Sequence, residues 1–472
     1  MNHTLLKNIL RLIGSSLLGG ITSFAFAVYA ANLWGVETYG TFTLAQTWIN
    51  ALLTMTDIGL SNVMIRAVAQ SKTKTPEILN IIALRIVLSI MAVGAANVFG
   101  WLTLGNSISV AQLAMFSLII PPSTIILASA AAFVGQERMF LGSLSAYAAS
   151  LCSITGMVII WMGHAITPIL ICFVSINIVV SLIGLRVLKN ENLLEGSIAP
   201  KLWLSYLREG FPFAIGSLIT VAGITAGPLL LSKLQGNAQV GYFNSANRLI
   251  QIIFLLISAC NTAIFPVFSR LRDNTHEIDH LYDLSIKLIL SCGLGAITIV
   301  SLMADTIFAV MFPAYLPSIR IFQVLMIYAF FSLLATPAIN LLYAYHLQGK
   351  AMKILAISIV SALPFYAVLV PMLGGVGVAL TYVVITLLQF VLSSRLSSSY
   401  VRINWLNTFA KGIGYFGLLV AVGLLLAPFN PLIRSAGLIL AFPFCVWPLK
   451  LVGIADLRSF ALSVRSVRKA QT

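Results

Sequence analysis

The sequence predicts an all-α polytopic membrane protein, and three observations lead to that prediction. First, 59% of the 472 residues are hydrophobic, 9% are charged and the mean hydropathy is +1.00, whereas soluble chains carry about 25% charged residues. Second, apolar runs of about 20 residues, the length of a transmembrane helix, recur along the chain. Third, basic residues gather in alternate connections between these runs. The runs are too long and continuous for the strands of a β-barrel.

About 14 transmembrane helices are expected from these runs. Their approximate centres are Ser23, Trp48, Ile90, Pro121, Cys152, Asn177, Thr220, Ile252, Gly295, Met326, Leu363, Val384, Leu418 and Phe442. The first run covers residues 12–33, about 22 residues, and is longer than the roughly 7–15 apolar residues of a secretory signal peptide. It is therefore predicted to be the first span.

The distribution of lysine and arginine predicts the orientation. If the N-terminus is cytoplasmic, all but four of the 28 basic residues lie near cytoplasmic ends of the spans. The exceptions are Lys233, Arg320 and Arg434, in connections on the other side, and Arg248, within a helix. Both termini are therefore expected in the cytoplasm. Because the net charge of +15 is spread between apolar runs, it does not indicate nucleic-acid binding.

The chain also contains an internal repeat. Three pairs of segments align in the same order: 39–45 with 240–246, 85–89 with 287–291, and 136–138 with 348–350. Helices 1–6 and 7–12 are therefore predicted to be parallel repeats, with two helices added at the end, and the substrate path of such transporters lies between the repeats.

The repeat also predicts the domain boundaries. The expected domains are an N-terminal six-helix lobe at 1–190, a cytoplasmic connector at 191–210, a C-terminal six-helix lobe at 211–395, two additional transmembrane helices at 396–455 and a basic cytoplasmic tail at 456–472.

Polar residues form a stripe on the second predicted helix, and the stripe recurs in the repeat. The first stripe comprises Thr43, Thr47, Asn50, Thr54, Asp57 and Ser61, within an arc of roughly 80°. The positions 201 residues later are Asn244, Arg248, Gln251, Leu255, Ser258 and Thr262. Hydrogen bonds between helices are the alternative explanation for one stripe. Two stripes on equivalent helices favour the lining of a shared cavity.

Arg248 is the strongest candidate for substrate binding. It lies about nine residues into its predicted helix, roughly 14 Å along it at 1.5 Å per residue. From that depth the side chain is poorly placed to extend its charged group to the membrane interface. Arg85 and Lys287 lie nearer the cytoplasmic face, where the charge distribution of membrane proteins also accounts for them. The predicted cavity residues are Arg248, Asn244, Gln251, Asn50, Thr47 and Arg85.

Asp57 is the only acidic residue well inside the predicted spans. It is either a coupling site for a proton or another cation, or the salt-bridge partner of a nearby arginine. Its place near the cytoplasmic end of its helix, where basic residues gather, favours the partner.

Two motif matches are rejected, and neither a catalytic residue nor a metal or other cofactor is expected. Residues 276–280 read H-E-x-x-H, but the loop offers no third ligand, and the segment fits a capped amphipathic helix. Residues 412–417 read G-x-G-x-x-G inside a predicted span, without a preceding strand, which indicates helix packing. The chain has no Walker A pattern, so a P-loop cannot supply ATP hydrolysis. The five cysteines all lie in apolar runs.

Segments 34–42, 57–60, 136–138 and 241–249 together resemble the polysaccharide-transporter family. These proteins flip O-antigen and related lipid-linked oligosaccharides, and their superfamily of multidrug, oligosaccharidyl-lipid and polysaccharide exporters includes lipid II flippases. The resemblance implies two six-helix lobes around a central cavity that opens alternately to each side of the bacterial inner membrane. It also implies a substrate carried on undecaprenyl pyrophosphate, a proton or sodium ion as coupling partner, and contact with the polysaccharide polymerase machinery.

Two other functions are alternatives to a flippase. A multidrug exporter of cations needs carboxylates in its cavity to bind them, and Asp57 is the only acidic residue well inside the predicted spans. An O-antigen polymerase has similar hydropathy but carries a large basic periplasmic loop, and the corresponding connections here are too short. The flippase is therefore ranked first, the exporter second and the polymerase third.

Overall fold

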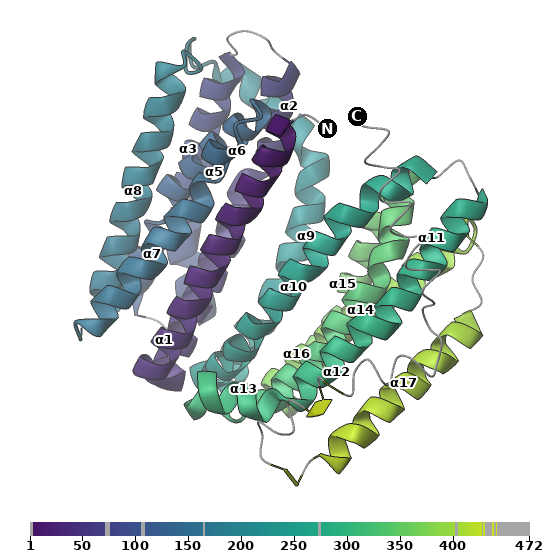
Figure 1. Ribbon diagram of the computed structural model, residues 1–472. Helices are drawn as coiled ribbons and strands as arrows, with labels where there is room; N and C mark the ends of the chain where they lie inside the picture. Colours follow the sequence, from purple (N-terminus) through teal and green to yellow (C-terminus); the bar gives the residue numbers. More distant parts are fainter. Residues whose placement is uncertain are drawn as a thin grey trace. The chain divides into compact units, whose positions relative to one another are not determined.

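The computed structural model describes residues 3–70, 76–104, 109–163, 166–271, 275–401, 405–426, 428–429, 437–438 and 440. Across these ranges the secondary structure is helical, without a strand (Figure 1). The contacts divide the chain into two compact units, Met1–Gly241 and Tyr242–Thr472.

Unit 1 is a bundle of long helices joined by short turns (Figure 1). Its elements are α1 (His3–Asp57), α2 (Leu60–Gln70), α3 (Pro76–Leu104), α4 (Val110–Ser117), α5 (Ile120–Gly135), α6 (Met139–Gly142), α7 (Leu144–Trp161), α8 (Ile166–Asn190), the 3₁₀ turn Pro200–Leu202 and α9 (Trp203–Gln235). α7 packs against α1 and α8, and α9 packs against α1, α2 and α3. α10 (Asn237–Leu271) begins in unit 1 and continues into unit 2.

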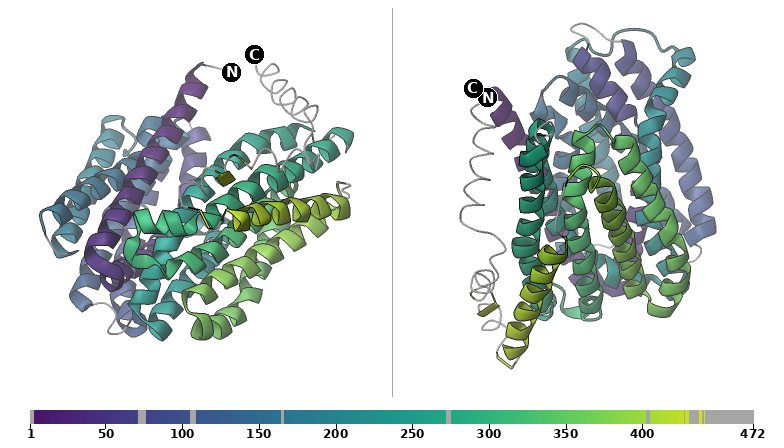
Figure 2. Two further views of the ribbon diagram at one scale, coloured as in Figure 1. Left: turned by 60° about the horizontal axis from the view of Figure 1, so that its bottom comes forward. Right: turned by 90° about the vertical axis from the view of Figure 1, so that its right-hand side faces the viewer.

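Unit 2 contains the rest of α10 and the helices that follow it. These are α11 (Thr275–Leu288), a π-helical turn (Ile289–Gly293), α12 (Leu294–Leu302), α13 (Ala304–Met311), a 3₁₀ turn (Pro313–Tyr315), α14 (Ser318–Ala344), α15 (Gln348–Leu373), α16 (Gly375–Ser397) and α17 (Trp405–Leu425). α16 packs against both α14 and α15, and α17 lies along α12 (Figure 2).

Ten helices within the described ranges are long and apolar enough to cross a membrane. The first of them, Gly14–Asp57, has 44 residues and holds two of the predicted centres, Ser23 and Trp48. Every later predicted centre up to Leu418 also lies within a helix, although α10 and the short apolar stretch of α17 are not among the ten. Phe442 lies outside the described residues. The chain is thus a multi-pass membrane protein, and the count of 14 spans stays a prediction.

Two glycines at equivalent positions of the predicted repeat have similar backbone angles. α1 is interrupted at Gly35, whose φ and ψ are 76° and 173°, and α9 ends at Gly236, whose φ and ψ are 83° and 172°. The two residues are 201 positions apart, the offset of the first aligned segments. A positive φ of this size favours glycine, since a Cβ would clash with the backbone. Both helices that carry the polar stripes therefore begin with the same backbone turn.

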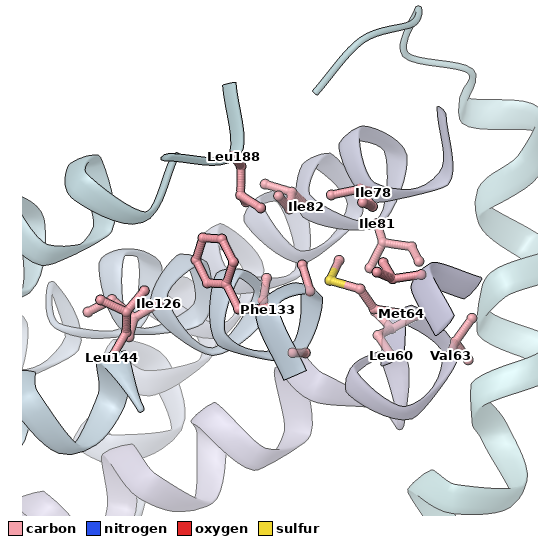
Figure 3. Packing of buried hydrophobic residues seen from close by; sticks show 14 of the residues in the cluster. Leu60, Val63, Met64, Ile78, Ile81, Ile82, Ile126, Phe133, Leu144 and Leu188 are labelled. Atoms are coloured by element: carbon pink, nitrogen blue, oxygen red, sulfur yellow. The ribbon is translucent and has the colours of Figure 1, made fainter. Parts of the chain in front are cut away.

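The middle of the predicted connector is held to α3 by an amide side chain. The buried Asn80 donates from Nδ2 to the Ser197 carbonyl at 3.1 Å and accepts from the Ala199 N–H at 2.6 Å. Apolar residues of α2, α3, α5, α7 and α8 form a core in unit 1 (Figure 3). The labelled members are Leu60, Val63, Met64, Ile78, Ile81, Ile82, Ile126, Phe133, Leu144 and Leu188. This core fixes the end of α3 that carries Arg85.

Candidate substrate-path residues

The threonines of the first stripe bond to their own helix. Thr47 donates to the Thr43 carbonyl at 2.8 Å, and Thr54 donates to the Asn50 carbonyl at 3.0 Å. Asn50 itself is exposed on the surface of unit 1. Because these hydroxyl donors are satisfied within α1, the stripe does not use them to join a second helix. Each oxygen still has a lone pair available for a ligand or water.

At its end, the first stripe contains a buried charge cluster. α1 ends at Asp57, the chain turns through Ile58 and Gly59, both with positive φ, and α2 begins at Leu60. The N–H and hydroxyl of Ser61 donate to Asp57 Oδ1 at 3.1 and 2.7 Å. Asp57 therefore caps the first turn of α2.

Arg85 on α3 completes this cluster. Its Nη2 forms an ion pair with Asp57 Oδ1, and its Nη1 donates to Ser61 Oγ at 3.2 Å. The Arg85 side chain is 1% exposed and that of Asp57 is 26% exposed. An arginine without a counterion in this position would destabilise the fold, because few groups inside a membrane protein can solvate its charge. Asp57 is thus the counterion of Arg85, and it is the Asp57 carboxylate, not the guanidinium, that reaches the surface of unit 1.

The equivalent basic residue in the repeat is paired differently. Lys287 on α11 forms an ion pair at 2.6 Å with Asp283, four residues earlier on the same helix. Both side chains are about one-third exposed. The cross-helix charge pair is therefore a property of unit 1 and does not recur at the aligned position.

In unit 2, the structure brings three predicted residues together on one face of α10. Asn244 is buried, Arg248 is half-buried and Gln251 is exposed. Arg248 Nη1 donates to Gln251 Oε1 at 3.5 Å, one turn further along the helix. The spacing of four and three residues explains this shared face. The two remaining polar positions of the stripe, Ser258 and Thr262, have side chains outside the described residues.

The two rejected motifs lie in helices. α11 includes residues 276–280 and buries Ile278, Leu281 and Tyr282, while His280 is exposed. In the described part of the chain, no three His, Cys, Asp or Glu side chains are placed to hold a metal ion. Gly412 of the second motif lies in α17 and packs against Leu290.

Sequence reasoning did not identify Asn237 at the start of α10. Its Nδ2 donates to Thr41 Oγ1 at 2.9 Å, and its Oδ1 accepts from Ser232 Oγ at 2.8 Å. The side chain thus links α9, α10 and the second half of α1. The repeat offered a signal, since Thr41 lies in the segment 39–45 and Asn237 lies just before the aligned segment 240–246.

Comparisons with known proteins give one family and one fold. The profile of the family described as "Polysaccharide biosynthesis protein" matches residues 5–272, more than half of the chain. The lipid II flippase MurJ in an inward closed conformation is 13% identical with a TM-score of 0.70, over 93% of this chain and 98% of that chain. No curated protein sequence matches.

Two further solved structures share this fold. A MOP-superfamily transporter from Pyrococcus furiosus is 16% identical with a TM-score of 0.55, over 83% of this chain and 96% of that chain. A variant of the Vibrio cholerae MATE transporter VcmN is 14% identical with a TM-score of 0.56, over 84% and 97%. At these identities the likeness shows the fold, which is that of MOP-superfamily transporters.

Proposed function

Because the chain belongs to the polysaccharide biosynthesis protein family, we propose that it is a flippase for a lipid-linked oligosaccharide. The substrate is a repeat unit on undecaprenyl pyrophosphate, as in O-antigen and lipopolysaccharide synthesis, and it crosses the bacterial inner membrane by alternating access. The observation that supports this most directly is Arg248, a half-buried arginine on the polar face of a helix in a transporter fold. Inside a membrane protein such a residue indicates a functional site.

The chemistry of the second stripe suits a pyrophosphate. A guanidinium offers a planar fork of N–H donors that matches two phosphate oxygens, so Arg248 can bind the anion through parallel hydrogen bonds. Asn244 and Gln251 lie on the same face, one turn to either side, and their amides can both donate and accept. They fit the remaining phosphate oxygens or the first sugar's hydroxyl groups. On the first stripe, Thr47 and Asn50 offer the same neutral polar groups.

An ion gradient is the proposed energy source, because the sequence has no P-loop for ATP hydrolysis. Asp57 is the candidate coupling acid, since its carboxylate is partly exposed. Its pairing with Arg85 gives it a structural task as well. A proton or sodium ion is the proposed coupling ion, and the polysaccharide polymerase machinery a proposed partner.

Export of lipophilic cations is the second candidate, favoured by the fold shared with MATE transporters. The charges of the described stripes disfavour cation export, because Arg248 would repel a cation and Asp57 is already paired with Arg85. A polymerase is a distant third.

The proposed function predicts transport of a pyrophosphate-linked glycan without ATP. Purified protein in liposomes should move a fluorescent polyprenyl-pyrophosphate glycan between leaflets, as measured by its accessibility to a membrane-impermeant quencher. Protein-free liposomes and a neutral polyprenyl glycan without the pyrophosphate are the controls. Transport of lipophilic cations alone would replace this function with the multidrug alternative.

The proposed topology predicts where inserted reporters lie. A reporter fused after Thr472 and one inserted between α10 and α11, after Leu271, should both behave as cytoplasmic, because basic residues gather there. As a matched control, a reporter inserted between α7 and α8, after Gly163, should behave as periplasmic. A periplasmic signal from either of the first two would reverse the orientation.

A further inference from the structure

Three basic side chains lie at one end of unit 2. α15 and α16 run side by side in opposite directions, joined by a turn at Gly374, so the start of α15 and the end of α16 lie at the same end (Figure 1). Lys350 and Lys353 are in the first two turns of α15, and Arg395 is in the last turn of α16. All three residues are exposed. They are called the basic corner below.

Apolar packing between the two helices holds the basic corner in place. Ala351 and Ile354 of α15 are buried in one small core, and Leu396 of α16 packs against it. Each of these three residues directly follows one member of the basic corner in the sequence. The backbone that carries the three positive charges is therefore fixed, and the charges stay near one another although they repel.

The basic corner has no acidic partner of its own. In the part of the chain that the structure describes, none of its three side chains forms an ion pair or a hydrogen bond. The sequence explains this, because it contains neither aspartate nor glutamate between Asp305 and Asp456. Neighbouring charges of one sign destabilise a fold through their repulsion unless an anion neutralises them. The counterion of the basic corner therefore has to come from outside the chain.

The equivalent corner of unit 1 carries its own acid. The repeat aligns Lys350 with Arg138, and Arg138 forms an ion pair with Glu191. Glu191 directly follows α8, the sixth predicted helix, just as Ser398 directly follows α16, the twelfth. α8 and α16 also each carry a basic residue in the last turn. Unit 2 thus keeps the positive charges of unit 1 but has a serine where unit 1 has the acid.

An exposed apolar strip continues along α15 from the basic corner. Ile357, Val360 and Val368 are each more than half exposed. At 100° per residue, these three residues share an arc of roughly 80° with Lys350 and Lys353. One leaflet is half of a hydrocarbon core about 30 Å thick and corresponds to about ten residues of helix. The strip is therefore long enough to lie against a whole acyl chain.

We propose that the basic corner binds the phosphate of an anionic phospholipid, whose acyl chain lies along the apolar strip of α15. A free phosphate ion would leave the strip unused, and a neutral phospholipid has no net charge to balance the corner. The predicted topology places this end of unit 2 on the cytoplasmic side, where each basic residue near an anionic membrane surface strengthens binding about fivefold. The inference concerns unit 2 alone and does not rest on the identity of the transported substrate.

The first test measures which lipid lies against the strip. In a cysteine-free background, Ile357→Cys carries a fluorophore, and the protein is reconstituted in vesicles that contain brominated phosphatidylglycerol or brominated phosphatidylcholine at equal mole fractions. Bromine quenches the fluorophore, and the relative association constant should favour phosphatidylglycerol by about tenfold. The matched control is the same label at Met372→Cys, exposed near the other end of α15, where the two lipids should quench equally.

The second test removes the charge of the corner in two ways. Lys350→Gln with Lys353→Gln should abolish the preference for phosphatidylglycerol at the Ile357 label. Ser398→Glu should also abolish it, because the new acid supplies within the chain the charge that Glu191 supplies in unit 1. Ser398→Gln, of the same size but uncharged, is its matched control and should leave the preference unchanged.

Three results would overturn the proposal. The first is equal quenching by the two lipids at Ile357, or a preference that survives Lys350→Gln with Lys353→Gln. The second is weak quenching by both lipids compared with Met372, which would show that protein, such as a second copy of this chain, covers the strip. The third is loss of the preference on adding inorganic phosphate at constant ionic strength, which would make the corner a site for free phosphate.

Discussion

Replacing Arg248 with alanine should reduce flipping by about ten- to a hundredfold. The guanidinium is placed on one face with Asn244 and Gln251, and losing hydrogen bonds to a charged group costs about 1.5–3 kcal/mol, where 1.4 kcal/mol is tenfold. Arg248→Lys should recover only part of the rate, because an ammonium is a point charge that cannot form the two parallel bonds. The rate is measured in liposomes, with expression and thermal stability measured beside it.

Arg320→Ala is the matched control for this prediction. Arg320 is an exposed arginine of the same unit, on α14 and not part of the polar stripe of α10, and its loss should leave flipping close to the wild-type rate. Normal transport by Arg248→Ala would remove the binding role. A loss of transport that follows a loss of folded protein would instead make Arg248 a structural residue.

Asp57→Ala is expected to destabilise the protein strongly. The substitution leaves the guanidinium of Arg85, 1% exposed, without its counterion and removes the cap of α2. Breaking a buried ion pair costs about 3–5 kcal/mol, and the 26% exposure of Asp57 places the expected loss near the lower end of that range. The measurement is the apparent midpoint of thermal unfolding in detergent.

Two further variants separate the ion pair from other effects. Asp283→Ala, which breaks the more exposed pair with Lys287 on one helix, should cost only about 0.3–0.5 kcal/mol. Asp57→Ala combined with Arg85→Met should regain much of the lost stability, because no buried charge is then left unpaired. If the double variant is as unstable as the single one, capping of α2 and not charge pairing explains the role of Asp57.

The helices of this protein follow from its sequence because apolar runs leave the backbone no other way to satisfy its hydrogen bonds. The predicted centres from Ser23 to Leu418 therefore lie in helices. The polar spacing of α10 likewise placed Asn244, Arg248 and Gln251 on one face, since helical periodicity is local.

Contacts between helices could not be predicted in the same way. Asp57 and Arg85 are 28 residues apart, and Arg66 is nearer to Asp57 in sequence. Only the packing of α1, α2 and α3 selects Arg85. The close backbone contacts of Gly40 with Asn237 and of Gly241 with Val36 were hidden for a different reason: glycines also occur where nothing packs closely, as at Gly94. The repeat aligned Gly40 with Gly241, yet alignment alone does not show that equivalent residues touch.

The Asp57–Arg85 pair also sets an order of events during biosynthesis. Asp57 leaves the ribosome 28 residues before Arg85, which corresponds to about 1 to 6 s at 5–20 residues per second. For that interval the nascent chain carries a membrane-embedded acid without its native partner. Once Arg85 follows, α1 and α3 can be joined as a neutral pair while most of the chain is still unmade. The ion pair can thus stabilise the contact between α1 and α3 before the later helices are synthesised.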